Sequence, residues 1–300
     1  MKLWAWAQSD PGRKRERNED SYLVDPETGL LAVADGMCGH QGGATASRMA
    51  VELVGRELAD ARGNFEKALM DNLRAAVRTT APMEAIEDTG EIVVPLMTTP
   101  VAGTERTLAA GSAAAVLSPV LELLRGVARR ASASIFEASW GKPELRGMGT
   151  TLTAALVHAG RVHLVHAGDS RCYLFRDGHL RQLTDDHSWI AEQLKTGAIT
   201  EAEAKSSKFR HVITKSIGFE REIDADLRSF PVSAGDCFLL CSDGMSNYVE
   251  HGELERIVAM TWYRRLPETL VELANQRGGD DNITVVVGLV ANAPPEPPPA

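Results

Sequence analysis

The clearest pattern of apolar and polar positions is β-type and begins near residue 149. Four extended apolar runs follow one another at 151–157, 162–167, 172–176 and 179–183. The first two flank His158-Ala159-Gly160, and the last two flank Asp177-Gly178, which between extended runs is a strong hairpin signal. Strands joined by turns of two or three residues must be antiparallel. The sequence therefore excludes a doubly wound parallel sheet.

Shorter signals occur on both sides of this region. Further strands are predicted at 30–34, 237–241 and 283–290, and a short apolar run stands at 22–24. Helices are predicted at 49–58, 65–77, 121–138, 188–195 and 201–205. The last of these begins at Thr200-Glu201-Ala202-Glu203, which is typical of a capping box.

Two segments break the pattern. Residues 79–119 are rich in Thr, Ala and Pro and contain no aromatic residue, so we interpret them as an insertion or mobile loop. Residues 292–300 form a proline-rich tail that we expect to be disordered. We expect the rest, residues 1–291, to form a single domain interrupted only by the insertion.

Charge and composition narrow the function classes. The chain of 300 residues has 41 acidic and 32 basic residues and a net charge of -9. An acidic surface repels a phosphate backbone, so we expect no nucleic-acid partner. The apolar start of the chain is too short for a signal peptide, and the longest uncharged run, 107–121, is too short to span a membrane. We expect a cytoplasmic protein without a membrane partner.

The four cysteines do not indicate a metal or disulfide framework. Cys237 and Cys241 have C-x3-C spacing, but no second Cys or His pair stands nearby to complete a zinc site. We interpret the cysteines as reduced thiols of the core.

Acidic residues recur at the ends of the predicted strands. These residues are Glu19, Asp20, Asp35, Asp169, Asp243 and Asp281. Several stand beside glycine, which lets the backbone turn sharply and brings its carbonyl close to a ligand. If the strand ends converge, they form an oxygen-only cluster that suits Mg²⁺ or Mn²⁺. The alternative is that each Asp-Gly is only a turn, and spacing alone does not show convergence.

A basic run, Arg13-Lys14-Arg15-Glu16-Arg17, lies close to the first of these acids. Such a run is usually a solvated face. Beside a metal cluster it could instead hold a phosphate dianion, which arginine grips with two donors.

Seven segments occur in an order that is familiar from one protein family. They are RKRERNEDSY, VADGMCGHQGG, MGTTLTAALV, HAGDSRCYLFRDG, LTDDHS, LLCSDGMSN and GGDDNITVVV. From about Ser9 to Leu289, except for the insertion, the chain resembles the bacterial branch of the metal-dependent Ser/Thr protein phosphatases, the PPM or type 2C family. The resemblance implies an α+β fold, a four-layer α/β/β/α sandwich of two antiparallel sheets flanked by helices.

The resemblance also implies an activity, the hydrolysis of phosphoserine and phosphothreonine on proteins with two Mn²⁺ or Mg²⁺ ions and a weaker third. By motif match, Asp35 would bridge the two metals and the Gly36 carbonyl would bind one of them. Asp243 and Asp281 would complete the other. No covalent enzyme intermediate is then needed, because a water activated by two metals can attack phosphorus directly.

The remaining matched residues have supporting roles in the family. Glu19 would help to hold the second metal, and Asp20 would mainly order water on the metals. Asp169 would bind the third metal together with Asp243. Arg15, four residues before Glu19, matches the arginine that binds phosphate.

Departures from the family pattern concern three positions, Cys38, Met37 and Asn247. Cys38 replaces a usual glycine, which either perturbs the loop or offers an oxidisable thiol; we favour the first. Met37 occupies the position of a histidine proposed as general acid in eukaryotic relatives, and no role carries over to the nearby His40. Asn247 stands where an aspartate often binds the third metal, so the affinity of that site is in question.

A further histidine, His187, opens the segment called the flap in relatives, here about 188–216. We interpret it as a structural, hydrogen-bonding residue.

Two function classes remain open at this point. An active phosphatase would act on phosphoproteins made by a Ser/Thr kinase, or on an anti-sigma-type regulator; a pseudophosphatase would bind a partner without turnover. All six acidic positions are present, whereas a decayed relative would be expected to have lost one. We therefore favour the enzyme and expect it to be a monomer.

Overall fold

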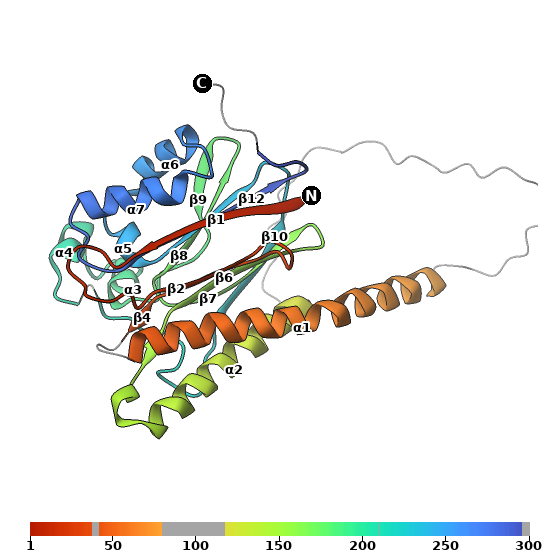
Figure 1. Ribbon diagram of the computed structural model, residues 1–300, viewed down its shortest axis with the longest axis horizontal. Helices are drawn as coiled ribbons and strands as arrows, with labels where there is room; N and C mark the ends of the chain where they lie inside the picture. The colour runs from red at the N-terminus through yellow and green to blue at the C-terminus, as the bar shows by residue number, and fades with distance from the viewer. Residues whose placement is uncertain (38–41, 80–117, 210, 296–300) are drawn as a thin grey trace, which may run out of the picture. The chain divides into compact units, whose positions relative to one another are not determined.

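The computed structural model describes residues 1–37, 42–79, 118–209 and 211–295. The chain divides into two compact units, one of residues 1–62 with 118–300 and the other of residues 63–117. The first unit contains every strand of the described residues (Figure 1). Of the second unit, the structure describes residues 63–79, which are helical.

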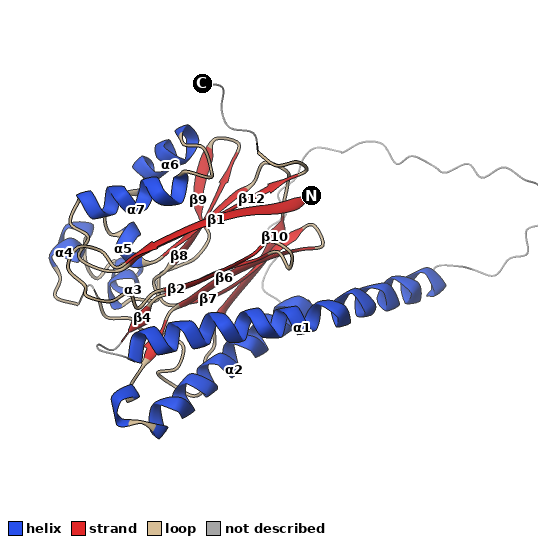
Figure 2. Ribbon diagram, in the orientation of Figure 1, coloured by secondary structure: helices blue, strands red, loops and turns tan. Residues whose placement is uncertain are grey.

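Ten of the strands form two antiparallel sheets (Figure 2). The first sheet has the order β1-β12-β11-β8-β9, made of Lys2–Asp10, Ile283–Ala291, Cys237–Cys241, Arg171–Arg176 and His179–Gln182. The second has the order β10-β7-β6-β3-β2, made of Asp226–Pro231, Arg161–Ala167, Leu152–His158, Leu30–Ala34 and Ser21–Asp25. Two short strands, β4 (Gly36–Met37) and β5 (Gly149–Thr150), pair with each other.

Both predicted hairpins are present, and their turns have the expected backbone. Ala159 and Gly160 have φ of 48° and 73°, and Asp177 and Gly178 have φ of 52° and 82°. Two successive positive φ values define the type I′ turn, whose twist matches that of antiparallel strands. The turn chemistry read from the sequence therefore fixes β6-β7 and β8-β9 as hairpins.

Alternation along β11 shows how the first sheet builds a core on each face. Cys237, Leu239 and Cys241 pack in a cluster with residues of the two C-terminal helices. Phe238 and Leu240 lie in another cluster with residues of both sheets. Since side chains alternate along a strand, one buried strand serves two layers of core.

The sheets are accompanied by helices, three of which pack on their outer faces. The helices are α1 (Gly42–Thr79), α2 (Pro119–Gly141), α3 (Trp189–Lys195), α4 (Glu201–Ser206), α5 (Asp243–Ser246), α6 (His251–Met260) and α7 (Leu266–Gln276), with a 3₁₀ turn at Pro143–Leu145. α6 and α7 pack on the first sheet, and α2 packs on β7 and β10 of the second. The expected α/β/β/α sandwich is confirmed (Figure 1).

Some elements differ from the sequence-based expectation. The prediction of separate helices at 49–58 and 65–77 is wrong, because α1 runs unbroken through the junction, which contains no proline. β1, β10, α6 and α7 were not predicted. The capping box at Thr200 is confirmed, with both reciprocal hydrogen bonds present. Most of the insertion (80–117) and the end of the tail (296–300) lie outside the described residues.

None of the helices in the described part of the chain is both long enough and apolar enough to cross a membrane.

Candidate active site

The acidic strand ends meet at one edge of the sandwich. Asp20 precedes β2, Asp243 follows β11 and Asp281 precedes β12. The hydroxyls of Ser242, at the end of β11, and of Thr284, in β12, both donate to Oδ2 of Asp20, at 2.8 and 2.7 Å. These two bonds join the start of β2 to two strand ends that lie more than 200 residues further along the sequence.

Asp35 lies among the other aspartates. Burial raises its pKa well above the usual value, and the negative charges of Asp20, Asp243, Asp169 and Asp281 raise it further. Its backbone is fully held: the N–H donates to Thr151 Oγ1 at 2.8 Å, and the C=O accepts from Thr150 Oγ1 at 2.8 Å. The carboxylate is therefore held by its main chain in a position of strong negative potential.

Asp20 presents one oxygen to the protein and one to the site. Its Oδ2 accepts the two hydroxyls of Ser242 and Thr284, while its Oδ1 is buried and has no hydrogen-bond partner. Burial raises the pKa of Asp20 to about 7, although the two hydroxyls act in the opposite direction. A buried carboxylate oxygen without a donor is costly unless a cation or water satisfies it.

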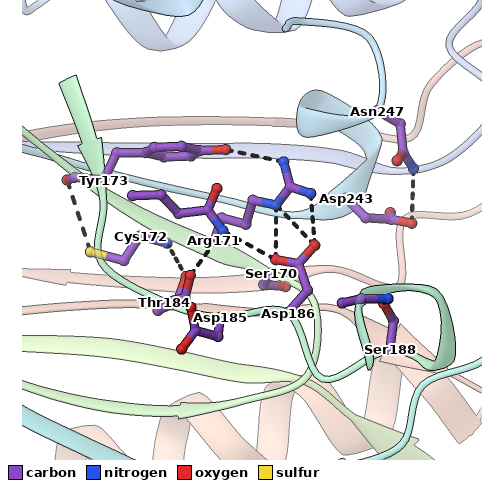
Figure 3. Close-up of polar contacts among 12 residues, drawn as sticks. Ser170, Arg171, Cys172, Tyr173, Thr184, Asp185, Asp186, Ser188, Asp243 and Asn247 are labelled. Carbon is purple, nitrogen blue, oxygen red and sulfur yellow. Dashed lines mark hydrogen bonds and ion pairs between the residues drawn. The ribbon is translucent and has the colours of Figure 1, made fainter. Parts of the chain in front are cut away.

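Asp243 has the same asymmetry (Figure 3). Asn247, one turn further along, donates its amide to Oδ2 at 3.1 Å, and Oδ1 is buried without a partner. Burial raises the pKa of Asp243, and the charge of Asp281 adds to this; a hydrogen bond with Asp35 acts in the opposite direction. Asn247 therefore stands directly beside the cluster, as the motif match implied.

Asp169 is held through its two neighbours. Gly168 is bound twice by His187: its C=O accepts the His187 N–H at 2.8 Å and its N–H donates to Nδ1 at 3.1 Å. The hydroxyls of Ser170 and Thr151 are 2.7 Å apart. Burial, followed by the charge of Asp243, raises the pKa of Asp169 to about 7. His187 is thus the hydrogen-bonding residue that the sequence suggested.

The start of the flap is also fixed by an ion pair. Arg171 holds Asp186 with two parallel bonds, Nε to Oδ1 at 2.9 Å and Nη2 to Oδ2 at 2.7 Å (Figure 3). Its Nη1 also donates to the hydroxyl of Tyr173 at 3.3 Å. This bidentate ion pair fixes Asp186, the residue immediately before His187.

Glu19 and Gly36 lie against the first turn of α1. A Cβ added at Gly43 would overlap Oε2 of Glu19 and stand 2.9 Å from the carbonyl carbon of Gly36. Only glycine therefore fits at Gly43, because the Glu19 carboxylate and the Gly36 carbonyl both approach this residue closely. Ser47, in the same helix, donates to the Glu19 carbonyl at 2.6 Å.

Arg15 is the member of the basic run that reaches the carboxylates. Its Nη2 donates to Oδ2 of Asp281 at 2.8 Å, whereas Lys14 pairs with Asp280 at 2.5 Å. About half of the Arg15 side chain is exposed. It therefore has access both to the cluster and to a ligand arriving from solvent.

The donor set fits divalent metal ions that prefer oxygen. It consists of carboxylates and one backbone carbonyl, and the unpartnered oxygens of Asp20 and Asp243 mark where a cation would be bound. Within the described residues, no three His, Cys, Asp or Glu side chains lie close enough together to hold a metal ion as they stand. Because like charges repel, such carboxylates draw tightly together only around a cation.

Sequence reasoning missed the residues that support these acids. They are Thr150, Thr151, Ser242, Asn282 and Thr284. Ser242, Asn282 and Thr284 stand within three residues of Asp243 or Asp281, and the other two bond the backbone of Asp35. Hydroxyl and amide residues are too common for such positions to identify them. Met37 lies in β4, opposite Gly149. Cys38 and His40 lie outside the described residues.

Comparison with known proteins identifies this arrangement. The protein phosphatase 2C family model matches residues 12–277. A serine/threonine phosphatase, stp, of Listeria monocytogenes is 32% identical over 286 residues, covering 93% of each chain. The protein phosphatase PstP of Mycobacterium tuberculosis is 33% identical, and the match covers 95% of this chain and 45% of that longer relative.

Solved structures agree with the sequence matches. The crystal structure of the Mycobacterium tuberculosis phosphatase PstP has a TM-score of 0.74 at 30% identity, covering 97% of this chain and all of that one. A PstP catalytic domain in complex with two manganese ions has a TM-score of 0.71 at 30% identity, covering 97% and 99%. This chain belongs to the protein phosphatase 2C family. The prediction of a metal-dependent protein-serine/threonine phosphatase is thereby confirmed.

Proposed function

We propose that the carboxylate cluster is the metal centre with which this phosphatase removes phosphate from phosphoserine and phosphothreonine in proteins. The observation that carries the proposal is the pair of buried, unpartnered oxygens on Asp20 and Asp243, inside a cluster that also holds Asp35. Two Mn²⁺ or Mg²⁺ ions would satisfy these oxygens and the surrounding negative charge.

Each acid has a proposed role. Asp35 would be shared by the two ions, the Gly36 carbonyl and Glu19 would help to hold one of them, and Asp243 and Asp281 would hold the other. The contact of Asp35 with Asp243 and that of Glu19 with the Gly36 region support this grouping. Asp169 and Asp243 share a weaker third ion, and their charges already act on each other.

The metal ions supply an activated water and offset charge on the phosphoryl group. Oδ2 of Asp20 accepts two hydroxyl hydrogen bonds, and its Oδ1 is left without a partner. Oδ1 can therefore orient a water molecule by accepting a hydrogen bond from it. Arg15 binds the phosphoryl oxygens of the substrate. Its pairing with Asp281 holds the guanidinium beside the cluster before substrate arrives.

The partners of this activity form a finer part of the proposal. The substrates are phosphoproteins made by a Ser/Thr protein kinase, and the enzyme acts as a monomer in the cytoplasm. The free, buried thiols of Cys172, Cys237 and Cys241 are compatible with a reducing compartment. Neighbouring genes would test the link to a kinase.

The second candidate is a pseudophosphatase that binds phosphoproteins without turnover. The full set of acids in one cluster favours the enzyme. Release of phosphate from a phosphothreonine peptide, measured with Mn²⁺ and again with excess EDTA, tests the choice. The enzyme releases phosphate only with the metal, whereas a binding module retains the peptide and releases none under either condition.

A further inference from the structure

Asn282 connects three points of the loop that carries Arg15. This loop, residues 11–19, runs between the end of β1 and the start of β2, and we refer to it as the Arg15 loop. The Asn282 amide donates from Nδ2 to the carbonyls of Pro11 at 3.0 Å and Arg17 at 2.8 Å. Its Oδ1 accepts the N–H of Glu19 at 2.8 Å. The side chain is only 5% exposed.

The Arg15 loop has no helix or strand of its own, so side chains must satisfy its polar backbone. Two further contacts anchor the loop: the Gly279 carbonyl accepts the N–H groups of Arg13 and Lys14, and Ser47 donates to the Glu19 carbonyl. Among the described residues, Asn282 is the side chain that binds the backbone on both flanks of Arg15, at Pro11 on one side and at Arg17 and Glu19 on the other. This side chain therefore ties the two ends of the loop together.

We propose that Asn282 is a positioning residue that holds the Arg15 loop over the carboxylate cluster, and so fixes the place of Arg15 and of the Glu19 backbone. The role of Arg15 in this inference rests on the proposed function. Asn282 does not touch the substrate; it acts through the loop. Its place next to Asp281 in the chain brings the loop to the same strand end as that acid.

The chemistry of the amide explains why asparagine is needed. Two N–H donors face two carbonyls, and one oxygen faces an N–H, so every bond requires the amide in one orientation. Aspartate has the same shape and could still accept from Glu19, but it has no donors for Pro11 and Arg17. It would also place negative charge against two carbonyl oxygens. Asn282→Asp therefore releases the loop without opening a cavity.

The first test does not depend on activity. The Arg15 loop contains four trypsin sites, Arg13, Lys14, Arg15 and Arg17, and cleavage requires local opening of the backbone. We expect trypsin to cut this loop at least about tenfold faster in the folded Asn282→Asp variant than in the wild-type protein. Mass spectrometry of the fragments measures the rate of cleavage. Asn282→Ala, which adds no charge, should also be cleaved faster in this loop. It serves as the test variant if Asn282→Asp does not fold.

A matched control separates loop release from general destabilisation. Asp236 is 1% exposed, accepts the Ser233 N–H, and precedes β11 at the end opposite Asp243. Asp236→Asn should lower the melting temperature without speeding cleavage in the Arg15 loop. Cleavage of the loop at the wild-type rate in both Asn282 variants would overturn the proposal.

The second test asks whether Asn282 acts through Arg15. Asn282→Asp should raise KM for an aryl phosphate and the inhibition constant of inorganic phosphate together, as we also expect of Arg15→Ala. In the double variant the two effects should not multiply, because residues in one network are not additive. Multiplying effects would show that Asn282 acts independently of Arg15. If wild-type enzyme releases no phosphate, the proposed function fails, while the cleavage rates still decide the role of Asn282.

Discussion

Arg15 donates a hydrogen bond to Asp281 over 2.8 Å, although 266 residues separate them in the sequence. This bond places one residue of a five-residue charged run at the edge of the carboxylate cluster. Its neighbour Lys14 pairs with Asp280 instead, and both groups of that pair are more than half exposed. Arg15 therefore differs from the rest of the run in position, which gives it a testable role.

Replacing Arg15 by alanine should weaken phosphate binding more than it slows chemistry. A hydrogen bond to a charged group contributes about 1.5–3 kcal/mol, so KM and the inhibition constant of phosphate should rise about ten- to a hundredfold. Arg13→Ala and Arg17→Ala serve as controls in the same steady-state assay and should change both constants little. Equal effects of all three substitutions would show that the run is only a solvated face.

The metal-free protein should lose stability as pH rises, whereas stabilisation by Mn²⁺ should increase over the same range. In the metal-free protein the pKa values of Asp20 and Asp169 are raised from 3.8 to about 7. The folded state then binds protons more tightly than the unfolded state, so this stabilisation is present below about pH 4 and is lost as pH rises through about 7. Mn²⁺ binds the ionised carboxylates, so its stabilising effect should grow over the same range.

The measurement is the difference in melting temperature with Mn²⁺ and with EDTA, at pH 5.5 and at pH 8. We expect a larger difference at pH 8. Burial lowers the pKa of His166 to about 4, so this residue also removes stability as pH falls. Its contribution is common to the Mn²⁺ and the EDTA samples, so it cancels in the difference between their melting temperatures. An equal Mn²⁺ effect at both pH values would contradict the account.

Two glycine-to-alanine substitutions should have opposite effects. A Cβ at Gly43 would overlap Glu19 and crowd Gly36, so Gly43→Ala should cost about 1–3 kcal/mol and weaken Mn²⁺ binding. At Gly252, in α6, a Cβ meets nothing within 4 Å, and alanine should add about 0.5–1 kcal/mol. Denaturant unfolding of both variants is the test. Gly43→Ala with wild-type stability and metal affinity would show that Glu19 is not confined there.

Asn247→Asp should strengthen the third metal site. The variant replaces the amide that donates to Asp243 with a carboxylate. This new carboxylate stands beside Asp243, whose charge also acts on Asp169. Metal-free stability should fall because like charges approach, and Mn²⁺ should bind more tightly at the weakest site. Calorimetric titration measures this change. Unaltered affinity would mean that Asn247 does not face the third ion.

The sequence was most informative where local chemistry decides structure. His158-Ala159-Gly160 and Asp177-Gly178 predicted two hairpins, because only residues that tolerate positive φ can form such turns. Thr200 and Glu203 predicted a helix start for a similarly local reason. The acids themselves were found because each follows or precedes a short apolar run.

The elements that escaped prediction depend on long-range packing. In β1, Trp4 and Trp6 pack toward the C-terminal helices while Leu3, Ala5 and Ala7 face the other core cluster. Since both faces are apolar, the strand shows no alternation of polar and apolar residues. The hydrogen bonds from Ser242 to Asp20 and from the Glu19 N–H to Asn282 join residues that are 222 and 263 positions apart. No local pattern marks the residues at either end.

The most direct test of the metal centre is phosphothreonine-peptide hydrolysis by Asp35→Asn. This substitution keeps the shape of the side chain and removes the charge that faces the other four aspartates, so Mn²⁺-dependent phosphate release should fall at least about a thousandfold. The metal-free variant should melt no lower than wild type, because a buried like-charge contact is relieved. Asp236→Asn, at the far end of β11, should keep its turnover. Retention of most of the Mn²⁺-dependent activity by Asp35→Asn would contradict the central claim.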